Sequence, residues 1–420
     1  MRSSGANPRP SSTWAFSRAW SWWAYGLCGS GGAPSREARS GGSPNVRGPV
    51  DTRARLGVEE TDCRNRFLKA VAIASVYDVA ARASVSPATA SRVLSGGNYP
   101  VRAETRARVL EAAADLNFQP NRLARALVTA RTSTIGAIVH DISDPYFGEI
   151  VRGLEDAARL HGYQLFVCSS DRNAERELEY VQALLSYRVD GLVFAGGGIE
   201  NEDYKRELRK TLDGFRTSGG AVVMLAPNSY KTPSVVPDNE GGARLLTRHL
   251  IDLGHRSIGF ISGPDHLRTS AIRLQGHRAE LDKAGIEVQD DLIESGQFTA
   301  EGGAKAVALL LERHPDITAV FAASDLMAFG VLSELASRSI RVPQDISVAG
   351  FDDVRPASYA GVPLTTVAVP MQSLGAEGAR MLVDVLAGKR PRSRVLPVEL
   401  VERQSTATVA RTKRSKSGSR

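Results

Sequence analysis

Hydroxyl and guanidinium side chains gather in the segment SPATASR, which spans residues 86–92. The hydroxyls of Thr89 and Ser91 can bond to phosphate, and the guanidinium of Arg92 can donate two parallel hydrogen bonds to one guanine. Such contacts need an exposed helix that fits the major groove of DNA. The residue types therefore indicate a DNA contact, with a generic helical hairpin and a solvated charge at Arg92 as the alternative.

Two short helices are predicted around this segment. Ser75 can cap the first helix, and Ser86 can cap a second helix that has Pro87 at its first position. Helical spacing gives the first helix an inward face of Val76, Val79, Ala80 and Ala83. The inward residues of the second helix are Ala90, Val93 and Leu94, and its outward residues are Pro87, Ala88, Ser91 and Arg92. Two short helices joined by the turn at 84–86 form a helix-turn-helix, whose second helix enters the major groove.

A third helix is predicted over residues 103–117, and it completes a miniature core with Val109, Ala113 and Leu116. Arginines outnumber carboxylates across this unit. The arginines are Arg82, Arg92, Arg102, Arg106, Arg108, Arg122, Arg125 and Arg131, against Asp78, Glu104, Glu111 and Asp115. The local basic excess is what a surface that contacts phosphates requires.

A different pattern begins at Thr134, where short β-branched runs alternate with segments of helical length. Strands that alternate with helices imply right-handed crossovers and parallel sheets. One series of strands is predicted near residues 134, 164, 190 and 221, and a second near 257, 319, 346 and 396. The chain is therefore expected to be an α/β protein with two doubly wound parallel-sheet lobes, preceded by a small all-α helix-turn-helix domain.

Polar and aromatic side chains follow several of the predicted strands. Ligands of open α/β sheets bind at the carboxyl ends of the strands, and two such edges that face each other would form a cleft. Carboxylates accept from vicinal hydroxyls, a guanidinium donates in a fork, and an aromatic face stacks on a ring. This chemistry favours a sugar or a sugar-like polyol. The candidate residues are Asp144, Tyr146, Phe147, Thr269, Arg273, Ser324, Asp325 and Asp352.

Arg273 and Asp352 are the strongest single candidates among these residues, with a structural ion pair across the lobes as the alternative. Helix N-capping is the alternative role for Asp144 and Asp325.

The segments YDVA, VSPATASRVL and TRARVLEAAADLNFQPNRLARAL resemble, in order and spacing, the N-terminal headpiece of LacI/GalR-family repressors. The resemblance implies a hinge helix at 121–128 that docks in the minor groove as a dimer and inserts Leu127 between central base pairs. So short a helix is marginal in water and needs a partner or DNA to order it. The DNA-binding residues implied are Tyr77, Ser86, Pro87, Ala88, Thr89, Ser91, Arg92, Asn121, Arg122, Ala124 and Leu127.

The chain departs from the family pattern in the headpiece. Ala90 stands where valine is frequent, and Ser95 stands where asparagine is frequent. Arg102 replaces a common capping serine, a loss of about 1 kcal/mol of helix stability. These differences bear on the operator sequence more than on the mode of binding.

The region from Thr134 to Thr406 resembles the periplasmic-binding-protein-like core of the same family, through DISDPYFGEI, RVDGLVF, HLIDLGHRSIGFISGP, AASDLMAFGVL and DISVAGFDD. The resemblance adds Phe298 to the cleft, because it matches a family aromatic. It also implies a purine as the less favoured alternative to a sugar. The expected function is that of a dimeric repressor whose affinity for a palindromic operator is controlled by a small molecule.

Other functional classes find little support in the sequence. We expect no enzyme, cofactor or metal site, because phosphate-binding, GxSxG, HExxH and dinucleotide motifs are absent and the seven histidines show no metal spacing. The net charge of +7 weakly favours a polyanionic partner, three scattered cysteines suit a reducing cytoplasm, and no run is apolar enough for a membrane span. We expect a cytoplasmic, nucleoid-associated protein. An exported solute-binding protein of a sugar transport system is the alternative.

Five regions are expected along the chain. Residues 1–72 are a disordered extension or a misassigned translation start, and residues 73–119 form the helix-turn-helix domain. Residues 120–132 are the hinge and linker, residues 133–406 the two-lobed ligand-binding and dimerisation domain, and residues 407–420 a basic disordered tail.

Overall fold

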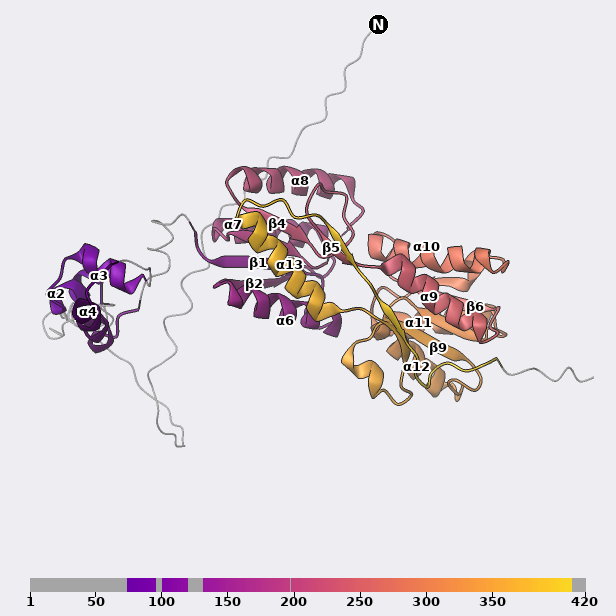
Figure 1. Ribbon diagram of the computed structural model, residues 1–420. Helices are drawn as coiled ribbons and strands as arrows, with labels where there is room; N and C mark the ends of the chain where they lie inside the picture. Colours follow the sequence, from indigo (N-terminus) through magenta and orange to yellow (C-terminus); the bar gives the residue numbers. More distant parts are fainter. Residues whose placement is uncertain (1–73, 96–99, 120–130, 197, 410–420) are drawn as a thin grey trace, which may run out of the picture. The chain divides into compact units, whose positions relative to one another are not determined.

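A computed structural model describes residues 74–95, 100–119, 131–196 and 198–409 (Figure 1). The predicted N-terminal extension, the predicted hinge at 121–128 and residues 410–420 of the predicted tail lie outside the described residues. The predicted tail starts too early in the chain, because the N–H of Ala407 donates to the Ser347 hydroxyl at 3.1 Å and the N–H of Val409 donates to the carbonyl of Leu253 at 3.0 Å.

The three predicted helices of the helix-turn-helix unit are present: α2 (Val76–Arg82), α3 (Pro87–Leu94) and α4 (Ala103–Asp115). Ser75 and Asp78 form a reciprocal capping box at the start of α2, and the Ser86 side chain caps α3. Buried Val79, Ala90 and Val109 bring one side chain from each helix into a small shared core. Short local caps and a few apolar contacts thus define this unit.

Helix α4 is shorter than the sequence predicts. It ends at Asp115, and Asn117 takes a left-handed conformation with φ 46°, which asparagine tolerates better than most residues. Arg102 occupies the N-cap position, and no side-chain cap bond is formed there within the described chain.

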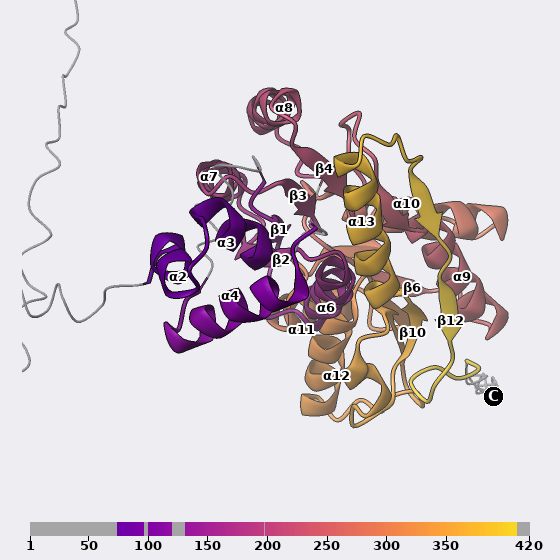
Figure 2. The ribbon, with the colours of Figure 1, turned by 60° about the vertical axis from the view of Figure 1, so that its left-hand side comes forward.

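The first lobe is a parallel four-stranded sheet in the order β2-β1-β3-β4, as Figure 2 shows in part. Its strands and helices alternate as predicted. They are β1 (Thr134–Val139), α6 (Pro145–Leu160), β2 (Gln164–Ser169), α7 (Ala174–Ser186), β3 (Gly191–Phe194), α8 (Glu202–Thr217) and β4 (Ala221–Met224). Strands β1, β3 and β4 are buried throughout, whereas β2 is a partly exposed edge.

The second lobe is a six-stranded sheet in the order β12-β10-β9-β8-β6-β7, in which only the pairing of β12 with β10 is antiparallel. Its elements before residue 320 are α9 (Asn239–Asp252), β6 (Ile258–Ser262), α10 (Arg268–Lys283), η1 (Asp290–Leu292), β7 (Ile293–Ser295), α11 (Ala300–Arg313) and β8 (Ala319–Ala322). The later ones are α12 (Asp325–Ser337), β9 (Ser347–Asp352), η2 (Arg355–Ser358), β10 (Thr365–Ala368) and β12 (Glu399–Val401). The two-lobed α/β architecture is therefore confirmed.

The chain passes between the lobes at β5 (Val235–Pro237), ahead of α13 (Met371–Leu386) and at β11 (Arg394–Leu396). Strands β5 and β11 pair with each other, and α13 packs against α6 of the first lobe. The two helices approach closely at Gly153, where an added Cβ would lie 1.9 Å from a backbone oxygen of Gln372. The chain thus returns to the first lobe at α13, and three crossing segments connect the two lobes.

One predicted strand is wrong in its extent. The sequence predicts one strand near residue 396, but the structure has two, because β11 ends at Leu396 and β12 begins at Glu399. Pro397 has no N–H to donate, so it interrupts the ladder where the chain changes partner strand. The sequence also did not indicate the short strands β5, β7 and β10.

Candidate functional site

The predicted DNA-reading residues of α3 lie on its exposed face. Pro87, Ala88, Ser91 and Arg92 are exposed, and Thr89 is half-buried. The Ser86 hydroxyl lies 2.9 Å from the Thr89 hydroxyl and accepts from the Thr89 backbone N–H at 3.2 Å. The capping geometry therefore places Ser91 and Arg92 outward, as a groove-reading helix requires.

Two further side chains belong to this surface or border it. Tyr77 on α2 is 69% exposed. Arg82 pairs with Asp115 at 2.9 Å, so one of the predicted basic residues is partly neutralised by α4. The other predicted DNA contacts, Asn121, Arg122, Ala124 and Leu127, lie outside the described residues.

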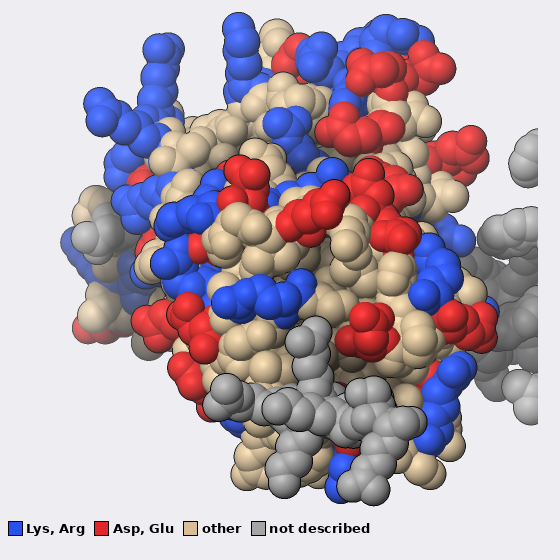
Figure 3. Space-filling model, turned by 90° about the vertical axis from the view of Figure 1, so that its right-hand side faces the viewer, with Lys and Arg blue, Asp and Glu red and all other residues tan. Residues whose placement is uncertain are grey.

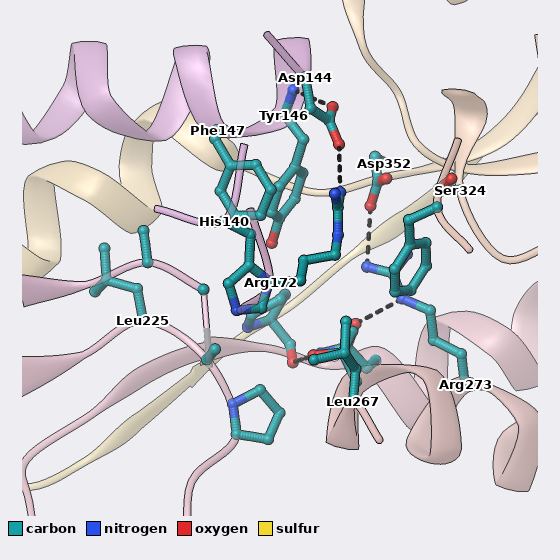
Figure 4. A pocket seen from close by; sticks show the side chains of 18 residues that line it. His140, Asp144, Tyr146, Phe147, Arg172, Leu225, Leu267, Arg273, Ser324 and Asp352 are labelled. Atoms are coloured by element: carbon teal, nitrogen blue, oxygen red, sulfur yellow. Dashed lines mark hydrogen bonds and ion pairs between the residues drawn. The ribbon is translucent and has the colours of Figure 1, made fainter. Parts of the chain in front are cut away.

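A cavity of about 60 Å³ lies at the carboxyl ends of strands from both lobes (Figure 4). The first lobe contributes His140, Asp144, Tyr146, Phe147 and Arg172 among others. The second lobe contributes Asn239, Thr269, Arg273, Phe298, Ser324 and Asp352 among others. Eight of the nine predicted ligand-binding residues therefore line one cavity.

Arg273 and Asp352 form an ion pair of 2.9 Å at the cavity wall. Arg273 also donates from Nε to Asn239 at 2.9 Å and from Nη1 to the carbonyl of Ala323 at 2.5 Å. Its guanidinium carbon lies 3.7 Å from the ring centroid of Phe351. Both partners of the ion pair belong to the second lobe, so the alternative of a pair across the lobes is wrong.

Asp352 is 6% exposed, and its backbone has φ 119°, in a region that non-glycine residues rarely adopt. Burial raises the pKa of Asp352 to about 7, although Arg273 opposes the shift. A strained, buried carboxylate at the edge of a cavity is typical of a binding position.

Asp144 caps α6 and also lines the cavity. Its side chain accepts from the backbone N–H of Tyr146 at 3.0 Å, which caps α6, and it also faces the cavity. Burial raises the pKa of Asp144, while Arg172, whose Nη2 lies 3.8 Å from the carboxylate, opposes the shift.

Arg172 was not predicted, although it follows β2 as Asp144 follows β1. It forms looser ion pairs of 3.8 Å with Asp141 and Asp144, and its buried Nε has no hydrogen-bond partner among the described residues. Its φ of 59° turns the chain back at the end of the strand. Polar residues after predicted strands are ligand candidates, and applying this criterion to the residues after β2 would have identified Arg172.

His140 is a second unpredicted residue of the cavity, immediately after β1. Burial lowers the pKa of His140 to about 3, so the imidazole is neutral at neutral pH. Within the described chain its buried Nε2 has no hydrogen-bond partner. Together with Arg172, His140 offers unused hydrogen-bonding capacity to a ligand.

The aromatic residues have unequal positions. Tyr146 and Phe147 pack edge to face with their centroids 5.1 Å apart, and Phe147 is only 6% exposed. Phe298 has φ 54° and packs against the cores of both lobes. The rings form a wall of the cavity more than a parallel stacking slot.

Asp325 is the exception among the predicted ligand contacts, because it is not part of the cavity lining. Its carboxylate accepts from the Thr366 hydroxyl at 2.6 Å and from the backbone N–H of Val354 at 2.9 Å. The N-cap of α12 is Ser324, which accepts from the N–H of Met327 and lines the cavity. Asp325 therefore joins α12 to two neighbouring segments, a role the sequence did not indicate.

In the part of the chain that the structure describes, no helix is long and apolar enough to cross a membrane. The same residues contain no cluster of His, Cys, Asp and Glu suited to a metal ion.

Comparison with known proteins matches two family models to this chain. Residues 75–121 match the bacterial regulatory proteins of the lacI family, and residues 247–406 match the periplasmic binding protein-like domain. Catabolite control protein A of Priestia megaterium is 36% identical over 337 residues, which cover 79% of this chain and 99% of that protein. The HTH-type transcriptional repressor PurR of Edwardsiella ictaluri is 36% identical over 80% of this chain and 97% of its own length.

Solved structures give the same result. The lac repressor dimer bound to operator and the anti-inducer ONPF superposes with a TM-score of 0.70 at 28% identity, over 80% of this chain and 99% of that one. The transcriptional regulator CelR in complex with cellobiose gives a TM-score of 0.59 at 34% identity, over 79% of this chain and 99% of that one. The chain belongs to the lacI family of bacterial DNA-binding transcriptional regulators.

Proposed function

We propose that this protein is a dimeric repressor whose affinity for a palindromic operator is set by a sugar bound in the cavity between the lobes. The observation that carries the proposal is the convergence of buried charged side chains from both lobes on one cavity. A ligand that contacts Arg172 of the first lobe and Asp352 of the second favours one relative position of the lobes, and differential affinity of this kind shifts a conformational equilibrium.

The polar groups of the cavity favour a sugar. Asp144 and Asp352 can accept from vicinal hydroxyls, and Arg172 and His140 have unused hydrogen-bonding atoms. Relatives with bound sugars include CelR with cellobiose and a regulator of Enterococcus faecium with ribose, the latter 29% identical with a TM-score of 0.58. A purine is the second candidate, but the described aromatic residues of the cavity do not form a pair of parallel rings between which a purine base could stack.

The cavity of about 60 Å³ has room for a few water molecules but not for a sugar. Ligand binding therefore requires the lobes to separate or Arg172 to leave the position it shares with Asp141 and Asp144. Ion pairs of 3.8 Å, longer than a hydrogen bond, make Arg172 the side chain that moves at least cost.

A thermal-shift screen of monosaccharides, disaccharides and purine bases tests the ligand class. We expect a sugar to raise the melting temperature of the wild type, and Arg172→Met to abolish this shift when it is measured from the variant's own unliganded melting temperature. A response to purines alone would overturn the sugar assignment.

Operator binding is tested by selecting DNA from a random library and measuring its affinity at several salt concentrations. We expect a palindromic site with a central pyrimidine-purine step, which bends easily. Binding that shows no sequence preference at any salt concentration would refute the repressor proposal.

Exposed apolar side chains on each lobe support a dimer. On the first lobe, the edge strand β2 exposes Phe166 at 46% and Val167 at 40%, next to Tyr187 at 69%. On the second lobe, a hollow of about 840 Å³ is bordered by Phe329 and by Tyr359, which is 72% exposed. Apolar patches of this kind mark protein contacts, and a second copy of the chain is the occupant we propose.

Light scattering tests the dimer with Phe166→Glu and Tyr359→Glu, either of which we expect to increase the fraction of monomer. Leu309→Glu on α11 is the matched control, because Leu309 is 47% exposed outside both patches. A dimer that persists in both variants would place the interface elsewhere. Charged side chains of both signs are interspersed on the face of the molecule that Figure 3 shows.

A further inference from the structure

The chain enters the first lobe through Thr132 and Ser133, directly before β1. The Asp190 carboxylate accepts from the Thr132 N–H at 3.0 Å with one oxygen and from the Ser133 N–H at 2.8 Å with the other. The Thr132 hydroxyl donates to the carbonyl of Arg188 at 2.9 Å. We call Thr132, Ser133 and Asp190 the attachment clamp.

The backbone of the attachment clamp adopts a conformation that needs support. Ser133 has φ 54°, in the left-handed region that serine rarely occupies. This turn directs two successive amides at one carboxylate, as in other anion-binding backbone nests. Asp190 is 9% exposed, so the charge-assisted hydrogen bonds are largely shielded from water and stabilise the strained residue.

The attachment clamp lies at the opposite end of the strands that reach the ligand cavity. β1 runs from Thr134, next to the clamp, to Val139, which precedes His140 of the cavity. Asp190 directly precedes β3, whose far end leads to Ala195 of the cavity. Six strand residues span roughly 20 Å. The buried strands β1 and β3 pair with each other, so one continuous piece of sheet connects the attachment clamp to the cavity edge.

Helix α13, which packs against α6 of the first lobe, ends at the same point. Arg131 donates from Nη2 to the carbonyl of Leu386, the last residue of α13, at 3.0 Å. Just before the other end of the helix, the Val369 N–H donates to the carbonyl of Asp352 at 3.1 Å. The attachment clamp and its neighbour Arg131 therefore contact the starts of β1 and β3, whose far ends reach the cavity, and the end of α13, which begins just after the segment bonded to Asp352.

We propose that Asp190 is a positioning residue for operator binding, one that fixes the angle and position at which the DNA-reading part of the chain leaves the first lobe. This inference rests on the proposed operator binding. Two half-sites are read at a fixed spacing, so slack at the attachment lowers specific affinity. Non-specific binding depends on counterion release and does not require that spacing.

The test uses the full chain, an operator selected from a random DNA library and a scrambled duplex of the same length. We expect Asp190→Asn to weaken operator binding about tenfold and binding to the scrambled duplex by less than about twofold. Hydrogen exchange at Ser133 should accelerate, while exchange within β3 and the melting temperature of the lobes stay near the wild-type values.

Two substitutions at Ser133 test the same contact without Asp190→Asn, so the inference can be tested even if that variant does not fold. Ser133→Pro removes the donor and cannot adopt positive φ, so the same loss of operator affinity is expected. Ser133→Gly keeps the N–H and adopts the conformation freely, so affinity is retained. Asp213→Asn is the control for loss of a carboxylate, since Asp213 is an exposed partner of Arg216 in the same lobe.

Unchanged operator affinity in both Asp190→Asn and Ser133→Pro would overturn the inference, and so would an equal loss on both duplexes. A wild-type chain that prefers no DNA sequence would instead refute the proposed function itself.

Discussion

The proposed DNA-reading surface of α3 and the proposed ligand cavity hold their side chains in opposite ways. On α3, Ser86 and Thr89 bond to each other across three positions, and Arg92 points to solvent. In the cavity, Arg273 bonds to residues 34, 50 and 79 positions away in the sequence and is 2% exposed. Substitutions on α3 should therefore cost function alone, whereas substitutions at Arg273 should cost stability as well.

The largest effect is expected for Arg273→Ala, which leaves the Asp352 carboxylate and the Asn239 amide oxygen without their donor. Removal of one partner of a buried ion pair costs about 3–5 kcal/mol. Urea denaturation followed by circular dichroism measures the loss. Arg92→Ala is the matched comparison and should change the free energy of unfolding by less than about 0.5 kcal/mol. Similar changes in the free energy of unfolding for the two variants would show that the two sites do not differ in their contribution to stability.

A second prediction concerns pH and Glu177, a residue of α7 that is 1% exposed. The hydroxyls of Tyr204 and Ser170 donate to it, and burial raises its pKa to about 7. The native state then binds more protons than the unfolded state between about pH 4.5 and 7. Stability from this group is complete below that window and falls, by about 3 kcal/mol, as pH rises through it.

Glu177→Gln should remove the contribution of Glu177 to this pH dependence in chemical denaturation at pH 5, 6, 7 and 8, while Asp352, whose pKa burial also raises to about 7, keeps its own contribution. Asp78 in the capping box gives the opposite sign, because hydrogen bonds from Ser75 lower its pKa. Its contribution is present above the unfolded pKa and is lost as pH falls. A Glu177→Gln variant that keeps the wild-type slope would show that Glu177 does not titrate in this window.

A third prediction tests the exposed surface through Arg92→Lys, which keeps the charge but loses the planar fork. Operator affinity should fall by about 1–3 kcal/mol, because a bidentate contact to one base is lost. Affinity for scrambled DNA should remain, since it depends on charge. Gel shift on both duplexes measures the two values, and a parallel loss would assign Arg92 to phosphate contact.

The smallest effect is expected for Arg102→Ser at the uncapped start of α4. A serine at the N-cap can accept from the backbone N–H two or three residues ahead, which should stabilise the helix by about 1 kcal/mol. Slower hydrogen exchange of the α4 amides measures the gain. Arg102→Ala separates the cap from the charge, because it removes the cation from the helix N-terminus without adding an acceptor. An equal gain in both variants would show that charge, not capping, limits α4.

The cavity shows how far reasoning from strand ends can reach. It found Asp144, Arg273 and Asp352, because a polar residue after a buried parallel strand must emerge at the ligand edge. It missed Asn239, because Asn239 follows β5, a strand too short to show a period. It placed Asp325 in the cavity because a neighbouring serine and aspartate at a strand end look alike until their bonding partners are known.

The sequence by itself determined the helix-turn-helix, the order of strands and helices in both lobes and most of the polar lining of the cavity. Caps, periodicity and strand ends act over a few residues, so they can be read without the fold. Only the tertiary structure decided that Arg273 and Asp352 pair within one lobe, that Asp325 joins α12 to distant backbone, and that Asp190 holds the chain ahead of β1. Each of these depends on which distant donor meets a buried carboxylate, and burial and long-range contact exist only once the chain has folded.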